Sequence, residues 1–101
     1  MRRAAVSYME DLLQDLRDPR EAAAYLNAAI EEGSQEAFLL ALRDVAEAHG
    51  MSDVARKAHL NRESMYRMLS KRGNPRLSSL ATLLEELGLR LNVEAKSPAL
   101  V

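Results

Sequence analysis

Each of the four glycines in this chain stands directly after a stretch in which apolar residues recur with helical spacing. They are Gly33, Gly50, Gly73 and Gly88. Glycine is the usual residue just past a helix C-terminus, because it adopts a positive φ without a clash at Cβ. We therefore expect a chain built from short helices that end at these positions.

Signals for helix starts alternate with the glycines. Asp18 followed by Pro19 offers an N-cap and a first-turn proline, a favoured beginning for a helix. Between starts and stops, apolar residues recur every three or four positions, as on one helix face. Leu26 and Ile30 share such a face before Gly33. Other residues suited to cap a helix start are Ser34, Ser52, Asn61 and Ser78.

The composition excludes several classes of protein. Of the 101 residues, 48% are hydrophobic but only 4% are aromatic, so aliphatic side chains must form the core. The absence of cysteine excludes disulfides, thiolate metal sites and cysteine nucleophiles. No apolar run approaches the roughly 20 residues that span a bilayer, and the N-terminus lacks the apolar region of a signal peptide. We expect a cytoplasmic protein.

One segment near the C-terminus has a different period. From Leu89 to Ala95, apolar and polar residues alternate strictly, which predicts a short β-strand. A single strand cannot form a sheet alone. It must therefore pair with another copy, pair with a partner protein, or not form at all.

Charge is distributed unevenly along the chain. Residues 1–50 hold ten acids and five bases, whereas residues 51–101 hold five acids and nine bases. Between Ala55 and Arg76 there are seven bases and a single acid, Glu63. Such asymmetry suggests two surfaces for two kinds of partner, although charges that only solvate a small domain would give the same totals.

Two short helical patterns adjoin in the basic region. The first runs from Ser52 to Ala58 and the second from Arg62 to Arg72, with only His59, Leu60 and Asn61 between them. This is the length of a helix-turn-helix turn. The small Ala55 allows a close helix crossing, and Leu60 can reach the core from the turn. The position of His59 is commonly glycine, and a positive φ at histidine costs roughly 1 kcal/mol.

Helical geometry assigns two sides to the second pattern. At 100° per residue, Met65, Met68, Leu69 and the stem of Arg72 face inward. Guanidinium groups on the opposite side can bind guanine, and a carboxylate can accept from cytosine. We predict base-reading roles for Arg62, Glu63, Ser64, Tyr66, Arg67 and Ser70. We predict phosphate contacts, which position without specifying sequence, for Ser52, Arg56, Lys57, Lys71 and Arg76.

The other chemistry-bearing residues do not form a catalytic or metal site in the sequence. His49 and His59 stand outside any zinc-ligand spacing. Adjacent acids such as Glu85 and Glu86 point about 100° apart on a helix, so they make no catalytic dyad. The separated glycines form no phosphate-binding loop. We expect no enzyme activity, no cofactor and no metal.

Three segments, in order, carry a family resemblance. They are YLNAAIEEGSQEAFLLALRDVA, HGMSDVARKAHLNRESMYRMLSKRGNP and LSSLATLLEELGLRL. Over roughly residues 20–95 the chain resembles the addiction-module antidote proteins, which are antitoxins with an Xre-type (phage-repressor-like) helix-turn-helix. The resemblance implies an all-α, five-helix lambda-repressor-like domain. It also implies pairing with a small RelE/HigB-like ribonuclease toxin and repression of the shared operon.

The resemblance supports part of the predicted DNA surface. It places Arg62, Glu63, Ser64 and Arg67 at base-reading positions and Ser52 at a phosphate-contacting helix start. Two positions depart from the family pattern, namely His59 in the turn and Arg76 where a hydroxyl helix cap is common.

From these patterns we expect a helical N-terminal extension in residues 1–33, the helix-turn-helix domain in residues 34–95 and a flexible tail in residues 96–101. We expect a homodimer on double-stranded operator DNA, joined through the Leu89–Ala95 strand or the exposed edge of the Leu80–Leu87 helix. Two alternatives stay open: a stand-alone phage-like repressor without a toxin, and a protein-interaction module that no longer reads DNA.

Overall fold

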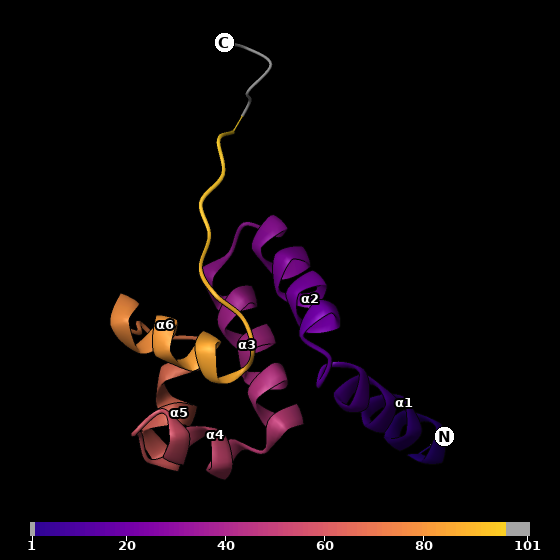
Figure 1. Cartoon of the computed structure of the whole chain (residues 1–101). Helices are drawn as coiled ribbons and strands as arrows, with labels where there is room; N and C mark the ends of the chain where they lie inside the picture. The colour runs from indigo at the N-terminus through magenta and orange to yellow at the C-terminus, as the bar shows by residue number, and fades with distance from the viewer. Residues whose placement is uncertain (1, 97–101) are drawn as a thin grey trace.

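The computed structural model describes residues 2–96, with side chains from residue 8 onward, and all regular structure in this range is helical (Figure 1). This confirms the expected all-helical class. Six helices occur in residues 2–96, two of them before residue 34. Their bounds are α1 Arg2–Asp15, α2 Pro19–Glu31, α3 Gln35–His49, α4 Met51–Lys57, α5 Arg62–Met68 and α6 Leu77–Glu86.

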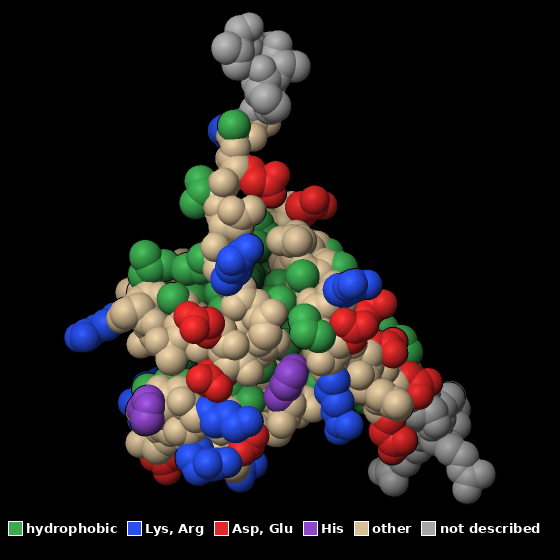
Figure 2. Space-filling view, in the orientation of Figure 1, with side chains coloured by type: hydrophobic (Ala, Val, Ile, Leu, Met, Phe, Trp, Pro, Cys, Tyr) green, Lys and Arg blue, Asp and Glu red, His purple; other side chains and the backbone are tan. Residues whose placement is uncertain are grey.

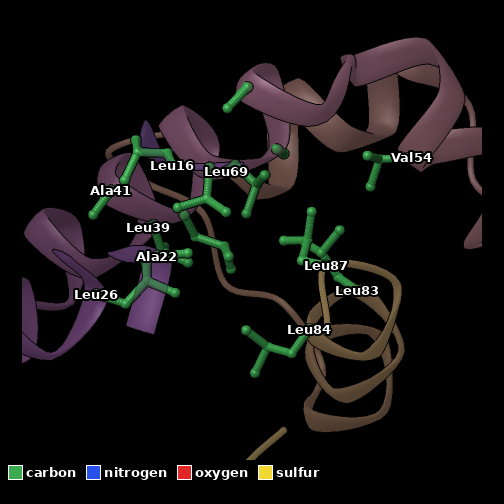
Figure 3. Close-up of a cluster of buried hydrophobic side chains, with 14 of the residues drawn as sticks. Leu16, Ala22, Leu26, Leu39, Ala41, Val54, Leu69, Leu83, Leu84 and Leu87 are labelled. Carbon is green, nitrogen blue, oxygen red and sulfur yellow. The ribbon is translucent and has the colours of Figure 1, made fainter. Parts of the chain in front are cut away.

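The central helix of the fold is α3, which packs against α1, α2 and α4. Leu39 and Leu42 on α3 are almost fully buried, and they belong to one continuous cluster with Leu16 after α1 and Leu83 on α6 (Figure 3). The cluster is aliphatic, as the composition requires. Each fully buried leucine contributes about 1.5–3 kcal/mol relative to an exposed one, so this core fixes where α4 and α5 stand.

Most of the predicted helix starts are confirmed by their caps. The side chain of Asp18 accepts a hydrogen bond from the backbone N–H of Arg20, and Ser34 Oγ accepts one from Ala37 N–H at 2.8 Å. The caps predicted at Ser52 and Ser78 were wrong. Both serines lie inside the first turn of their helices, because the N-cap positions are Gly50 and Arg76, which make no side-chain cap bond.

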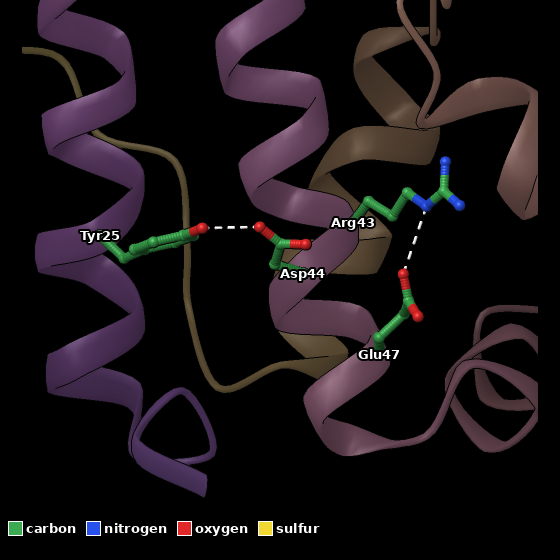
Figure 4. Close-up of polar contacts among 4 residues, drawn as sticks. All are labelled: Tyr25, Arg43, Asp44 and Glu47. Carbon is green, nitrogen blue, oxygen red and sulfur yellow. Dashed lines mark hydrogen bonds and ion pairs between the residues drawn. The ribbon is translucent and has the colours of Figure 1, made fainter. Parts of the chain in front are cut away.

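A polar contact joins α2 to α3 on the outer side of the core. The hydroxyl of Tyr25 donates to the Asp44 carboxylate at 2.6 Å (Figure 4). Burial, reinforced by this bond to a carboxylate, raises the pKa of Tyr25 well above its ordinary value. An ion pair also forms along α3, where Arg43 Nε lies 3.2 Å from Glu47 Oε1 (Figure 4).

The strand predicted from Leu89 to Ala95 is absent from the described part of the chain. The segment is extended and passes the end of α2 and the start of α3 (Figure 1), but it has no regular structure. A strand needs a ladder partner, and residues 2–96 contain no other strand with which it could pair. The alternating apolar and polar side chains predict a strand, but the segment forms no β-ladder within residues 2–96.

Candidate nucleic-acid interface

The turn between α4 and α5 follows a defined hydrogen-bond pattern. The backbone N–H of Leu60 donates to the Ala55 carbonyl at 2.8 Å, and that of His59 donates to the Arg56 carbonyl at 3.1 Å. These two bonds form a Schellman motif, in which the residue after the cap takes the left-handed conformation. His59 is that residue, with φ 60°, as its place in the turn predicted.

Packing holds this turn against the core. Ala55 is only 2% exposed, in keeping with the close approach expected of a small residue between α4 and α5. Leu60 is half-buried against the same cluster. Together they fix the direction in which α5 leaves the turn.

We expect His59→Gly to raise the free energy of unfolding by about 0.5–1 kcal/mol. The exposed His59 is the one non-glycine residue with positive φ in residues 2–96, whereas Gly88 takes the same conformation at the end of α6. Glycine removes the Cβ clash of the left-handed region. Urea unfolding checks this, with His59→Ala as the control that keeps the Cβ and gives no gain. Equal free energies of unfolding for the two variants would contradict the claim that the Cβ of His59 is strained at this positive φ.

The second helix of the pair, α5, is shorter than predicted. It begins as expected, with Asn61 Oδ1 accepting from the Ser64 N–H at 2.7 Å, but it ends at Met68 rather than Arg72. Leu69 leaves the helical region with φ −99° and ψ 48°. The chain then folds back over the end of α5, where Gly73 N–H donates to the Ser70 carbonyl at 2.9 Å.

Gly73 makes this return possible by lacking a side chain. A Cβ on Gly73 would lie 2.0 Å from the carbonyl oxygen of Met68. Its own carbonyl accepts a hydrogen bond at 2.9 Å from Nε2 of Gln35, in the first turn of α3. Gln35 is thus a positioning residue that the sequence analysis missed, because nothing local links it to a residue so far along the chain.

The inward side of α5 agrees with the predicted face in its centre. Met65 and Leu69 are fully buried, and Met68 is half-buried against the core. The prediction that the stem of Arg72 also faces inward was wrong. Arg72 is exposed, because it lies in the turn beyond the helix.

Some of the predicted base-reading residues are exposed, and the others are half-buried. Arg62, Glu63 and Arg67 are exposed on α5. Ser64 is half-buried in the first turn. Ser70 is half-buried beyond the helix, and its hydroxyl donates to the Arg67 carbonyl at 2.8 Å.

Tyr66 does not stand free on this surface. It is half-buried and packs against the core, with the Arg43 guanidinium 4.9 Å from its ring centre and that of Arg62 5.7 Å away. Cations at such distances are attracted to the negative face of the ring. The ring therefore aligns Arg62 beside α5 and brings Arg43 of α3 to the edge of the same surface.

The predicted phosphate contacts are all exposed, but two of them already have an acidic neighbour. Asp53 pairs with Arg56 and also with Lys57, the latter at 3.2 Å. Hydrogen bonds from Lys57 and Arg56 lower the pKa of Asp53. No ion pair involves Lys71, Arg76 or the α5 arginines among the described side chains. Ser52, the remaining predicted phosphate contact, is also exposed.

Seen from outside, a group of basic side chains lies at one end of the molecule. Figure 2 shows several Lys and Arg side chains, with Asp and Glu among them, over the region where Figure 1 places α4 and α5. Several Asp and Glu side chains lie along the side of α1 and α2. In the described residues no group of three His, Asp or Glu side chains has the placement of a metal site. The group of basic side chains suits a polyanionic ligand.

Comparison with known proteins identifies the class of this chain. The sequence model of the family described as "Probable addiction module antidote protein" matches residues 7–95. The chain belongs to this family, and membership in a family of antidotes implies a toxin as partner and indicates a role other than catalysis. No solved structure gave a significant match.

A relative comes from Haemophilus influenzae. It is a protein described as uncharacterized, 36% identical to this chain over 84 residues, which are 83% of this chain and 87% of the relative. The match therefore covers more than four-fifths of each sequence. None of the described helices is long and apolar enough to cross a bilayer.

Proposed function

We propose that this protein is the antitoxin of a type II module, which neutralises a small ribonuclease-type toxin of the RelE/HigB sort and represses its own operon by binding operator DNA. The observation that carries the DNA-binding half is the outer face of α5. There Arg62 and Arg67 are exposed, have no ion-pair partner among the described side chains, and sit on a helix fixed at both ends.

The chemistry of this face suits the major groove. The groove is about 12 Å wide and admits one helix, whose first turns approach the base edges. Arg62 and Arg67 can each donate two hydrogen bonds to guanine, and Glu63 can accept from the cytosine amino group. Ser64 and Ser70 lie at the margins of this contact, while Tyr66 supports Arg62 from the side.

Phosphate contacts surround the reading face in this proposal. Lys71 and Arg76 lie after α5, and Ser52 lies in the first turn of α4. Arg56 and Lys57 share Asp53, so each contributes less net positive charge than a lone cation. These contacts contribute binding affinity, which falls as the salt concentration rises. They do not contribute sequence preference.

Two copies are needed to hold a site tightly. A single small module buries too little surface for specific operator binding, and two reading helices about 34 Å apart match one turn of DNA. We therefore propose a homodimer on a pseudo-palindromic operator.

The test of DNA reading is a competition mobility-shift assay with the promoter fragment of the chain's own operon. Specific sites are typically bound about 10³-fold or more tightly than unrelated DNA at physiological salt. An excess of unrelated DNA should therefore leave the promoter complex intact. Equal competition by both DNAs would mean that the helix pair no longer reads sequence.

The toxin-binding half of the proposal rests on the charge of the opposite end. Glu10, Asp11 and Asp15 of α1 are exposed, next to the exposed apolar side chains of Tyr8 (69%) and Met9 (47%). A ribonuclease binds a polyanion and is expected to be basic, so an acidic surface with apolar residues complements it. We propose that this surface of α1 contacts the toxin.

We expect the double variant Glu10→Lys and Asp11→Lys to weaken toxin neutralisation by roughly tenfold or more, because both charges become repulsive toward a basic partner. Reversal is a cleaner change than deletion of α1, since Leu16 at its end is only 2% exposed and belongs to the core. Toxin affinity is measured by calorimetry, and promoter binding should change little.

The matched control reverses two adjacent exposed acids elsewhere, Glu85→Lys and Glu86→Lys on α6. It makes the same change in net charge at another place. If the control weakens toxin binding as much as the α1 variant does, total charge rather than the α1 surface governs the contact.

A further inference from the structure

The C-terminal segment carries apolar side chains that its own chain does not cover. Val93 is 95% exposed and Leu91 is 45% exposed. Nearby on α2, Ile30 is 55% exposed, although its helical spacing placed it on the inward face. Within the described residues, no backbone hydrogen bond joins residues 90–96 to another segment.

Ile30 and Leu91 line a shallow groove of about 250 Å³ between α2, α6 and the segment itself. Its apolar walls come from Leu26, Ile30, Phe38 and Leu84. The segment lines it with Leu91 and also with the polar residues Arg90, Asn92 and Glu94. Figure 2 shows hydrophobic side chains gathered at the foot of the segment, where it meets the helices. The apolar walls of the groove and the exposed Leu91 of the segment therefore adjoin one another.

The sequence of the segment is complementary to itself. If two copies pair antiparallel about Asn92, Arg90 of one copy lies opposite Glu94 of the other, and Leu91 lies opposite Val93. In such a ladder, directly opposed side chains are about 4.5–5.5 Å apart and opposite charges attract. Two-fold symmetry repeats each pair, so the register has two Arg–Glu pairs on one face and two Leu–Val pairs on the other.

This complementarity does not arise within one chain. Arg90 and Glu94 are four residues apart in an extended segment, which separates their Cα atoms by about 13 Å. The two charges therefore gain their direct partners only across a two-fold axis. Pairing would also satisfy the backbone groups that are left without partners here and cover the exposed Leu91 and Val93.

We propose that residues 89–95 form an antiparallel two-stranded ribbon with the same segment of a second copy, centred on Asn92, and that this ribbon lies beside the groove and Ile30. A two-stranded ribbon alone is marginally stable in water, and the groove supplies the apolar surface that it needs. The inference adds a specific interface to the homodimer contained in the proposed function. It is tested without DNA, so that its failure and the failure of DNA reading are distinguishable.

The test uses the full chain and measures self-association by sedimentation equilibrium. Arg90→Glu alone and Glu94→Arg alone each place like charges opposite one another twice, so each should weaken dimerisation by about tenfold. The double variant Arg90→Glu with Glu94→Arg restores opposite charges in the same register. We expect it to recover dimerisation to within about threefold of the unchanged chain.

Two further variants locate the interface. Val93→Lys should weaken the dimer by at least tenfold, while Leu77→Lys, at a residue 70% exposed on α6, should leave it unchanged. Helical circular dichroism verifies that each variant is folded, which the exposure of these side chains leads us to expect. Failure of the double variant to recover dimerisation would overturn the register. If the wild-type protein is a monomer, the proposed interface is wrong. The same holds if Leu77→Lys disrupts the dimer and Val93→Lys does not.

Discussion

Arg67→Ala is expected to weaken binding to the operator by about 1–3 kcal/mol and to relax the preference for one base pair in each half-site. The reason is that a guanidinium on the exposed face of α5 donates two hydrogen bonds to a guanine, and alanine leaves that base unread. The side chain of Arg67 is exposed, so its removal should not alter the core. The measurement is a set of dissociation constants for operator variants, each changed at one base pair.

The matched control is Lys71→Ala, which removes a positive charge just beyond the same helix. A phosphate contact carries no sequence information, so this variant should weaken binding to all sequences alike and reduce the salt slope by about 1. If Arg67→Ala behaves like Lys71→Ala, with the preference for every base pair retained, then Arg67 contacts the backbone and α5 is placed differently in the groove.

Gly73→Ala is expected to lower the free energy of unfolding by about 2–3 kcal/mol. A Cβ there would lie 2.0 Å from the carbonyl oxygen of Met68 and 2.8 Å from its carbonyl carbon, so the backbone at the end of α5 must move. That movement also displaces Lys71 and the hydrogen bond from Gln35, so operator binding should fall beyond the loss of stability. Urea unfolding and the mobility-shift assay measure the two effects.

Gly33→Ala provides the comparison for Gly73→Ala. A Cβ on Gly33 would meet nothing within 4 Å, but its φ of +81° makes a side chain costly there by about 1 kcal/mol. The Gly33 variant should therefore be destabilised less, with unchanged DNA binding. Equal destabilisation of the two variants would mean that the close approach at Gly73 relaxes easily.

Features fixed by neighbouring residues could be predicted from the sequence. The caps at Asp18, Ser34 and Asn61 are confirmed because each depends on a side chain and the backbone within three residues of it. The positive φ of His59 is confirmed for the same reason, since the Schellman bonds at the end of α4 are local.

Features fixed by tertiary contacts were predicted less well. The basic pattern after Met68 has helical spacing, yet the helix ends there, and Gln35 of α3 holds the returning chain by its bond to the Gly73 carbonyl. Tyr66 has the periodicity of the outer face, but Arg43 covers part of it. Neither contact has a sequence signal within α5 itself.

The C-terminal segment differs from both groups. Its alternation from Leu89 to Ala95 predicts a strand, and residues 2–96 of the single chain hold no other strand with which it could pair. The proposed interface would make this a property of two copies rather than one. In the same way, base-reading roles stay predictions until DNA is present for Arg62, Glu63, Ser64, Tyr66, Arg67 and Ser70.

The central claim, that the outer face of α5 enters the major groove of operator DNA, can be tested directly because the chain has no cysteine. Ser64→Cys and Glu31→Cys each create a single thiol, the first in α5 and the second at the end of α2. An iron chelate attached to either thiol cleaves DNA near its site of attachment. We predict discrete cleavage within the operator from position 64 and none from position 31. Binding without cleavage from position 64, or equal cleavage from both positions, would contradict the claim.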